Sequence, residues 1–161
     1  MSRLVQYLTL ATALGCGLSA GVFFAFSSFV MPALDRLAPA QSIRAMNAIN
    51  RVAVTPVFMS ALFGTALACV VLGGWALTSW GERSAMLALG GCALFVVGAI
   101  GVTMAANVPL NDALMQVDPR APDAATRWSS YLSDWTRCNH VRAGTAIAAS
   151  GLLIAALRVS P

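Results

Sequence analysis

The chain has 161 residues, of which 58% are hydrophobic and only 10% are charged. Soluble domains carry about 25% charged residues, so this composition excludes a water-soluble fold, which would lack a polar surface. The net charge is +4, and all ten basic residues are arginines, which are spread over segment ends and loops rather than along one stripe. Because no basic stripe could follow phosphates, we expect no nucleic-acid partner.

Four apolar stretches dominate the chain, at residues 5–31, 54–78, 85–106 and 140–157, and none has a charge in its central part. A hydrocarbon core of about 30 Å needs about 20 helical residues, so each stretch is long enough to cross a bilayer. A segment in lipid must satisfy its backbone groups internally, and the alternating strands of a barrel are absent. The sequence therefore predicts an all-α integral membrane protein, with residues 1–161 forming one domain of four transmembrane helices.

The beginning of the chain imitates a signal peptide. Arg3 precedes an apolar run, and residues 13–16 resemble a lipoprotein cleavage site. The run continues to Met31, however, whereas a cleaved signal has an apolar core of only about 7–15 residues. We therefore expect an uncleaved first span.

Two excursions separate the spans. Pro32 is expected to close the first span, and residues 41–54 have apolar side chains at helical spacing, which predicts a short amphipathic helix. Pro56 marks where that helix bends into the second span. The link at residues 79–83 is short, so the second and third spans should be antiparallel neighbours.

The longer excursion follows the third span. It contains a turn at residues 117–122, and Pro122 and Asp123 suit the first turn of a new helix. No helix breaker follows before Gly144, so one helix of about 50 Å should run from Asp123 into the fourth span.

Small residues and cysteines fill the spans. Glycines such as Gly17, Gly21 and Gly98 permit close helix contact, which we interpret as packing within the bundle, with a homo-oligomer face as the alternative. No cysteine pair has CxxC spacing, and we read the cysteines as small buried side chains rather than as a disulfide framework or zinc site. The four are Cys16, Cys69, Cys92 and Cys138.

Polar residues gather on helix faces where the spans meet the excursions. Thr103, Asn107 and Asn111 recur at every fourth position and share one face. A second stripe, beside which His140 lies, consists of Trp128, Tyr131, Trp135, Asn139 and Arg142. Asn47, Asn50 and Arg51 belong to the loop that emerges on the same side in a four-span chain. We therefore expect three polar clusters to meet at one mouth of the bundle.

Simpler interpretations of these residues stay open. Tryptophans at a membrane edge are often interfacial anchors, and Asn107 or Asn139 could cap a helix end. Arg142 could extend to the lipid headgroups, and a single histidine is often structural. The number of asparagines favours a site, because capping needs only one at each helix end.

Several chemistries find no support in the sequence. The carboxylate and histidine set of a di-iron bundle is absent, and no glycine-rich phosphate loop occurs. One histidine excludes a bis-histidine haem, whereas a single-histidine haem stays open. We expect no metal and no built-in cofactor.

Five motifs at these positions carry a family resemblance: AGVFFAFS (residues 20–27), VMPA (30–33), MNAINR (46–51), TMAANVPLND (103–112) and WTRCNHVR (135–142). The chain resembles the anthrone-oxygenase-like family of small four-span membrane proteins over almost its full length. The resemblance implies oxidation of anthrones to anthraquinones by molecular oxygen, apparently without a metal or flavin, as associated with fungal members. Cys138 stands where we expect another aromatic residue, which would alter the shape of the pocket.

The residue types suit that chemistry. His140 could remove the proton of an acidic methylene, since histidine exchanges protons near neutral pH. Arg142, Asn107, Asn111 and Asn139 could hold the resulting oxyanion. The remaining candidates would bind an aromatic, apolar substrate, with Tyr131 and Trp135 as a flat slot; they are Trp135, Tyr131, Trp128, Asn47, Asn50, Arg51 and Thr103. The alternative is a non-catalytic membrane protein that binds a lipid, a quinone-like molecule or a partner protein.

The arginines also suggest an orientation in the membrane. Seven lie in the loops after the first and third spans, against three on the other side. The positive-inside rule then places both loops in the cytoplasm and both termini outside. We expect an integral protein of a bacterial cytoplasmic membrane.

Overall fold

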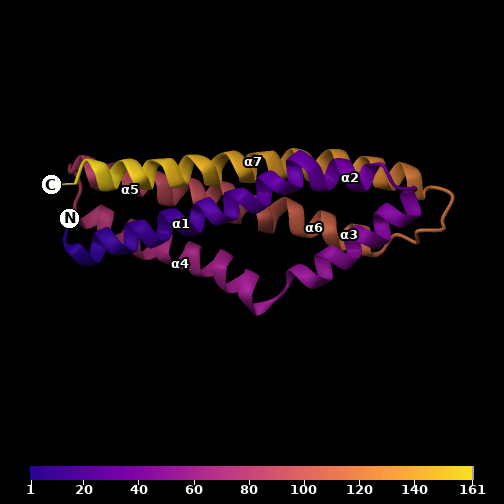
Figure 1. The fold of residues 1–161 in the computed structure, drawn as a ribbon, viewed down its shortest axis with the longest axis horizontal. Coiled ribbons are helices and arrows are strands. Elements are labelled where there is room, and N and C mark those ends of the chain that lie inside the picture. Colours follow the sequence, from indigo (N-terminus) through magenta and orange to yellow (C-terminus); the bar gives the residue numbers. More distant parts are fainter. Residues whose placement is uncertain (161) are drawn as a thin grey trace.

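The computed structural model describes residues 1–160 and is 87% helical, with no strand in that part of the chain. Four helical stretches are long and apolar enough to cross a membrane, and they form a bundle with both termini at one end (Figure 1). They are Arg3–Asp35, Pro56–Thr78, Arg83–Met115 and Ala124–Arg158. The all-α, four-helix architecture predicted from the sequence is confirmed.

The first stretch contains a π-helical segment. It consists of α1 (Arg3–Ala25), the π-helical Phe26–Val30 and α2 (Met31–Asp35). The prediction that Pro32 closes the first span is therefore wrong, because the helix continues to Asp35. A proline normally collides with the carbonyl four residues back. Here the turn is widened, because the Met31 N–H donates to the carbonyl of Phe26 five residues back.

The third stretch passes a proline in the same way. Its parts are α5 (Arg83–Ala93), the π-helical Leu94–Gly101 and Thr103–Asn107, and α6 (Val108–Met115). The Val108 N–H donates to the carbonyl of Thr103 just before Pro109. The helix thus extends beyond the predicted residues 85–106 and carries Asn107 and Asn111 on one continuous rod.

The last helix is the longest. α7 (Ala124–Arg158) has 35 residues, which corresponds to about 52 Å, and confirms the single helix predicted from Asp123 into the fourth span. At its start, Arg127 Nε donates to Asp123 Oδ2 at 2.7 Å, and this hydrogen bond holds the pKa of the Asp123 carboxyl below its usual range. α7 packs against α1 and α5 along the bundle (Figure 1).

A sharp corner joins the amphipathic helix to the second span. α3 (Pro39–Ala53) ends just before α4 (Pro56–Thr78), and Pro56 lies in the first turn of α4, as predicted. The Thr55 hydroxyl caps that turn by accepting from the Phe58 N–H at 3.3 Å. The corner points away from α7, so α3 and α4 form a wide V along one side of the bundle (Figure 1).

The bundle has two hydrophobic clusters with different compositions. The cluster toward the termini is built mainly from small residues, and its α7 face consists of Ala143, Ala146, Ala149, Leu153 and Ala156. The cluster toward the excursions is built from larger side chains, among them Met31, Ile43, Met46, Trp128, Tyr131 and Trp135. Small residues let the helices approach closely in the first cluster.

One glycine and three thiols show how tight the first cluster is. A Cβ on Gly98 would lie 2.6 Å from the Thr145 Cβ, so only glycine fits there without a shift of α7. Cys16, Cys69 and Cys92 are buried, with Cys69 in hydrogen-bonding reach of the other two, and all are free thiols. They behave as the small buried side chains expected from the sequence.

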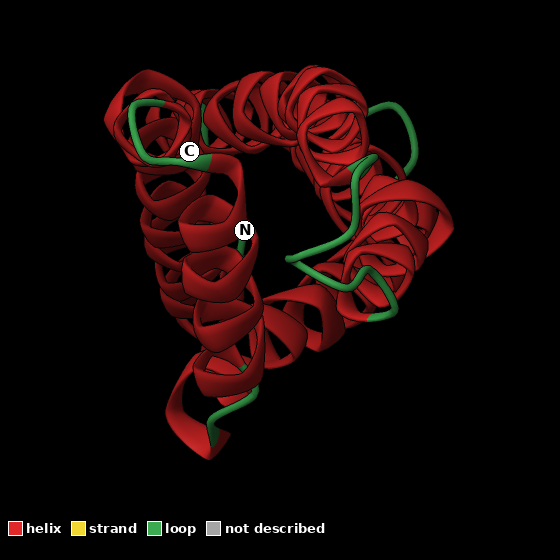
Figure 2. Cartoon of the chain, turned by 90° about the vertical axis from the view of Figure 1, so that its right-hand side faces the viewer, coloured by secondary structure: helices red, strands yellow, loops and turns green. Residues whose placement is uncertain are grey.

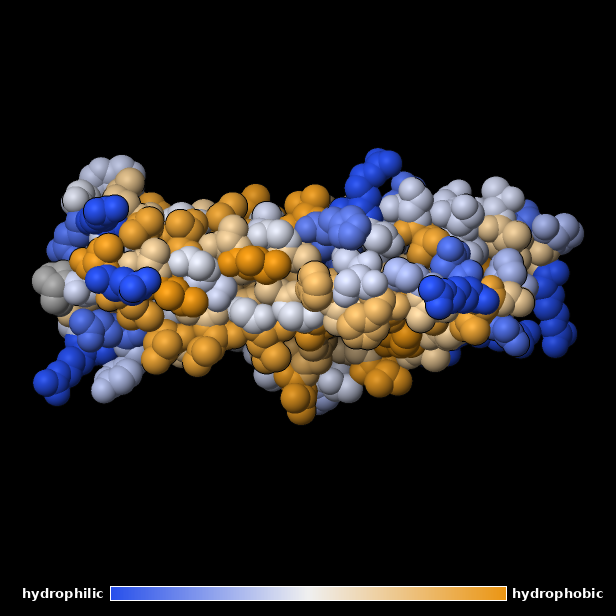
Figure 3. All heavy atoms as spheres, turned by 45° about the horizontal axis from the view of Figure 1, so that its top comes forward, coloured by the Kyte–Doolittle hydropathy of each residue, from blue (hydrophilic) through white to orange (hydrophobic). Residues whose placement is uncertain are grey.

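The surface reflects these two parts. Seen along the bundle, the helices stand around a common axis (Figure 2). Apolar side chains dominate the half of the surface that leads to the termini, and hydrophilic side chains gather at the two ends (Figure 3). This banding is typical of a protein whose apolar half faces lipid.

Candidate functional site

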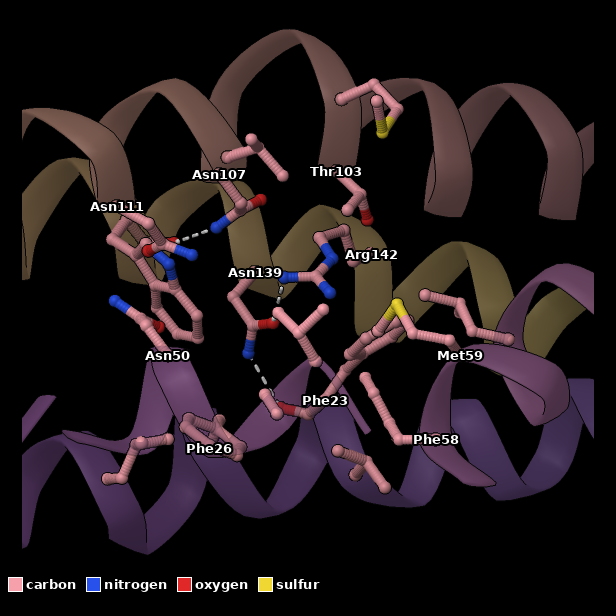
Figure 4. A pocket seen from close by; sticks show the side chains of 18 of the residues that line it. Phe23, Phe26, Asn50, Phe58, Met59, Thr103, Asn107, Asn111, Asn139 and Arg142 are labelled. Atoms are coloured by element: carbon pink, nitrogen blue, oxygen red, sulfur yellow. Dashed lines mark hydrogen bonds between the residues drawn. The ribbon is translucent and has the colours of Figure 1, made fainter. Parts of the chain in front are cut away.

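A cavity of about 200 Å³ lies where the two hydrophobic clusters meet. Its polar wall comes from α7 and from the π-helical end of the third stretch (Figure 4). Its apolar wall comes from α1, α3 and α4, with Phe23, Phe26, Phe58 and Met59 among the lining residues. Ligand pockets are typically about 300–1,000 Å³, so this cavity suits a compact ligand.

Arg142 lies in this cavity, near the middle of α7, and is only 7% exposed. Its guanidinium carbon lies 3.9 Å from the centroid of the Phe23 ring, and its Nη1 donates to Asn139 Oδ1 at 3.2 Å. No aspartate or glutamate is among the lining residues, and the ion pair found in the described chain, Arg127–Asp123, is elsewhere. The charge of Arg142 therefore has no protein counterion in the cavity.

Asn139 is fully buried and positions Arg142. Its Nδ2 donates to the Phe23 carbonyl at 2.7 Å and to Ser27 Oγ at 2.8 Å, which leaves Oδ1 for Arg142. These bonds connect α7 to the junction between α1 and its π-helical segment. Because both amide atoms are engaged, the orientation of the amide is fixed by its partners.

Asn107 faces Arg142 from the neighbouring helix. It is 1% exposed, and its Nδ2 donates to the backbone carbonyl of Trp135 at 3.2 Å. Its Oδ1 has no partner among the described residues. Thr103, one turn away, also lines the cavity but bonds its hydroxyl to the Ala99 carbonyl at 2.7 Å.

Four buried polar atoms of the cavity residues have no hydrogen-bond partner within residues 1–160. Three are donors: Arg142 Nε, Trp135 Nε1 and Asn50 Nδ2, the last of which lies close to the Tyr131 hydroxyl. The fourth is the acceptor, Asn107 Oδ1. Buried polar groups are nearly always paired, so four open atoms around one cavity indicate a ligand that offers acceptors together with a donor.

Other candidate residues lie next to the cavity but are engaged in holding the excursions together. Tyr131 donates from its hydroxyl to Asn111 Oδ1 at 2.8 Å, which places Asn111 at the edge of the cavity. Trp128 Nε1 donates to Asp35 Oδ1 at 3.2 Å, and Asn47 Nδ2 donates to the Leu114 carbonyl at 3.4 Å. Tyr131, Trp128 and Asn47 do not line the cavity.

The structure does not bring His140 and Arg51 to the cavity. Both side chains are exposed. His140 faces a separate hollow on the other side of α7, which it shares with Asp35 and Arg137. Consecutive helical residues point about 100° apart, so a helix that turns Asn139 inward turns His140 away.

The structure also bears on the simpler interpretations, in which these residues contact headgroups, anchor the protein at the interface or cap helices. Arg142 is buried against Phe23 rather than extended toward headgroups. Trp128 and Trp135 are 3% and 4% exposed, so neither presents its ring to an interface. Asn107 precedes α6 but makes no side-chain capping bond there.

Comparison with known proteins agrees with this picture. The model of the anthrone oxygenase family matches residues 55–152, which is more than half of the chain. The chain belongs to this family. The match includes the polar wall of the cavity, from Thr103 to Arg142, and excludes α1 and α3, so it covers less of the chain than the resemblance seen in the sequence. The chain matches no curated protein and no solved structure.

The sequence did not single out three contacts that shape the site. Phe23 covers the guanidinium, Ser27 fixes Asn139, and Met59 closes the apolar wall. Phe23 and Ser27 fall within the motif at residues 20–27, which is the signal that could have found them. Met59 is one apolar residue among many in its span, and no pattern distinguishes it.

Proposed function

We propose that this protein is a membrane-embedded oxygenase-like protein that binds the anion of a compact aromatic carbon acid, anthrone-like or phenolic, and oxidises it with molecular oxygen without a cofactor. The observation that carries the proposal is the buried guanidinium of Arg142, which has no carboxylate partner in its cavity. An unpaired charge is costly to bury, so such an arginine is best explained by an anionic ligand.

The open polar atoms suit an enolate or phenolate. Its oxygen would accept from Arg142 Nε and Trp135 Nε1, both of which lack partners among the described residues. Charge-assisted hydrogen bonds of this kind are about twice as strong as neutral ones. A hydroxyl elsewhere on the same ring system would donate to Asn107 Oδ1.

The rings would lie between aromatic walls. Phe26 and Trp135 are in contact, with centroids 5.6 Å apart, and Phe23 lies on the guanidinium beside them. Phe58 and Met59 face them from α4 (Figure 4). The volume of about 200 Å³ favours a compact ring system, so a larger anthrone would have to displace flexible side chains such as Met59.

The proposed reaction uses the anion directly. Loss of a methylene proton leaves an enolate, which passes one electron to molecular oxygen. The carbon radical and superoxide then combine to form a peroxide at that carbon. The peroxide takes up a proton and loses water, which leaves a carbonyl. One ring methylene and one molecule of oxygen thus become one carbonyl and one molecule of water, and no further reductant is needed.

The contribution of the protein would be electrostatic. The cavity lining includes neither His140 nor an acidic residue, so proton removal by a histidine, as suggested by the sequence, is not part of this proposal. Arg142 would instead stabilise the anion, so that the acid ionises on binding and its proton passes to water. Fixed donors in a dry site stabilise developing charge strongly.

Oxygen consumption by purified protein in nanodiscs, supplied with a panel of anthrones and naphthols, tests this function. We expect turnover above that of empty nanodiscs, and loss of that turnover in Arg142→Gln. Binding of the same compounds without oxygen uptake would contradict the oxygenase and favour the non-catalytic binding protein. An Arg142→Gln variant as active as the wild type would contradict the role of the guanidinium.

A further inference from the structure

An apolar groove adjoins the cavity on the outside of the bundle. It lies between α1 and the corner formed by α3 and α4. Val22, Phe26, Ile49, Ala53 and Phe58 line both the groove and the cavity, so these side chains lie between the two. The corner of the V that α3 and α4 form stands on this side of the bundle (Figure 1).

The rim of the groove is apolar and exposed. Val52, Val54 and Val57 at the corner are 69%, 71% and 82% exposed. Thr55 is the polar residue of the groove lining, and its hydroxyl already accepts from the Phe58 N–H. Exposed valines around a groove without charges suit contact with lipid rather than water.

The opposite end of the cavity is closed. Met46, which lines it, is only 1% exposed. Asn111 lies at that end (Figure 4), and its Oδ1 accepts a hydrogen bond from the Tyr131 hydroxyl at 2.8 Å. An apolar molecule arriving from water would have to break these contacts, whereas one arriving at the corner meets movable apolar side chains.

The position along the bundle also places the cavity within reach of lipid. Arg142 lies sixteen residues before the end of α7 at Arg158, which corresponds to about 24 Å of helix. The hydrocarbon core is about 30 Å thick. A bundle whose termini lie at one membrane surface therefore holds Arg142 near the far edge of the hydrocarbon.

We propose that the aromatic acid enters the cavity sideways from the bilayer, through the gap between α1 and the α3–α4 corner. This route rests on the proposed function for the identity of the ligand, and not for its turnover. The rings remain in an apolar environment throughout, so entry costs little desolvation. The ionisable oxygen leads and reaches Arg142 while the rings follow it past Ile49, Ala53 and Phe58.

Narrowing the gap tests the route. Ala48 is an exposed residue of the groove lining, and Ala53 separates groove from cavity, so Ala48→Trp and Ala53→Trp should obstruct entry. Gln41→Trp provides the matched control, since Gln41 is exposed on the same helix and lies outside the groove. Thermal unfolding of each variant identifies any that do not fold.

The measured quantity is the association rate of a naphthoate with protein in nanodiscs, followed by the fluorescence of the probe. In wild type and Gln41→Trp, we expect the rate to follow the mole fraction of probe in the lipid. In Ala48→Trp we expect it to fall about tenfold or more, with a dissociation constant changed by less than about threefold, because a blocked gap slows entry and exit together. Ala53→Trp also narrows the cavity, so only its rate is compared.

Each remaining outcome bears on a different claim. Rates that follow the aqueous probe concentration and are equal in all folded variants would overturn the lateral route. Slowed association in Ala48→Trp, together with no oxygen consumption by the wild type on the panel of anthrones and naphthols, would support the route and contradict the oxygenase. Association by Arg142→Gln with wild-type affinity would show that the probe is held elsewhere and would overturn both.

Discussion

The two halves of the bundle are packed with side chains of different size. In the half toward the termini, alanine, glycine and cysteine bring the helices close together, and the buried threonines donate to backbone carbonyls; for example, the Thr12 hydroxyl donates to the Leu8 carbonyl at 2.7 Å. In the half toward the excursions, the cluster is built from larger side chains, and the cavity lies at the boundary between the two halves.

The two halves differ in whether their buried polar atoms have hydrogen-bond partners, rather than in hydrophobicity. All six buried side-chain atoms without a partner in the described chain belong to residues of the cavity or of the helices around it, and none belongs to the half toward the termini. A scaffold needs its polar groups paired, whereas a binding site keeps some free for a ligand. Substitutions should therefore affect stability in one half and binding in the other.

The largest expected effect comes from Arg142→Met. Loss of an electrostatic contact at the reacting oxygen should reduce turnover by about 10²–10³-fold. Replacement of a buried charge by an apolar side chain is often neutral or stabilising, so the melting temperature should be equal to or above that of the wild type. Oxygen consumption and thermal unfolding check the two halves of this prediction. Arg137→Met, at an exposed arginine of α7, should change neither.

Asn139→Leu should affect both binding and stability, because this residue connects the halves. It removes the bonds to the Phe23 carbonyl and Ser27 and leaves Arg142 without its amide partner. We expect a loss of about 1–3 kcal/mol in the free energy of unfolding, together with loss of ligand binding. Ser27→Ala removes one of these bonds and should cost less. Unimpaired binding in a folded Asn139→Leu variant would contradict the positioning role.

Gly98→Ala tests the tight helix packing of the half toward the termini. The added methyl would collide with Thr145, so we expect a loss of about 1–3 kcal/mol in stability, with unchanged turnover per folded molecule. Gly101→Ala is the control, since the nearest atom to its added Cβ lies 3.6 Å away. A change in substrate affinity caused by Gly98→Ala would show that the two halves are coupled.

His140→Ala should have the smallest effect. The side chain is exposed and lies outside the cavity, so turnover and affinity should stay within about twofold of the wild type. A large loss would return proton removal to this histidine. A visible spectrum of the purified protein is expected to lack haem and flavin bands, and a haem band lost in the variant would contradict cofactor-free chemistry.

Helical spacing accounts for the part of the site that the sequence predicts. Asn107 lies on one rod, Trp135, Asn139 and Arg142 on another, and the structure brings them together because the spacings of three and four residues fix the faces. The same rule should have separated His140 from Asn139. We grouped His140 with the site because it is adjacent to Asn139 in sequence. In a helix, however, the side chains of adjacent residues point in different directions.

The remainder depends on tertiary contacts that no single-sequence pattern contains. Pro32 and Pro109 continue their helices only because the preceding turns are π-helical, and such widening is decided by packing. Asn47, Trp128 and Tyr131 have the residue types of a binding site, yet the Asn47 Nδ2, the Trp128 Nε1 and the Tyr131 hydroxyl donate to groups on other helices. Which polar residues stay open follows from the assembled bundle.

The most direct test of the account measures the preference of the cavity for charge. Wild-type protein in nanodiscs should bind a naphthoate at least about tenfold more tightly than the neutral naphthylmethanol of similar size. A tenfold ratio corresponds to about 1.4 kcal/mol. The preference should disappear in Arg142→Gln, while the affinity for the neutral compound stays the same. Equal affinities in the wild type, or a preference that survives in Arg142→Gln, would contradict the claim that Arg142 is kept unpaired to bind an anion.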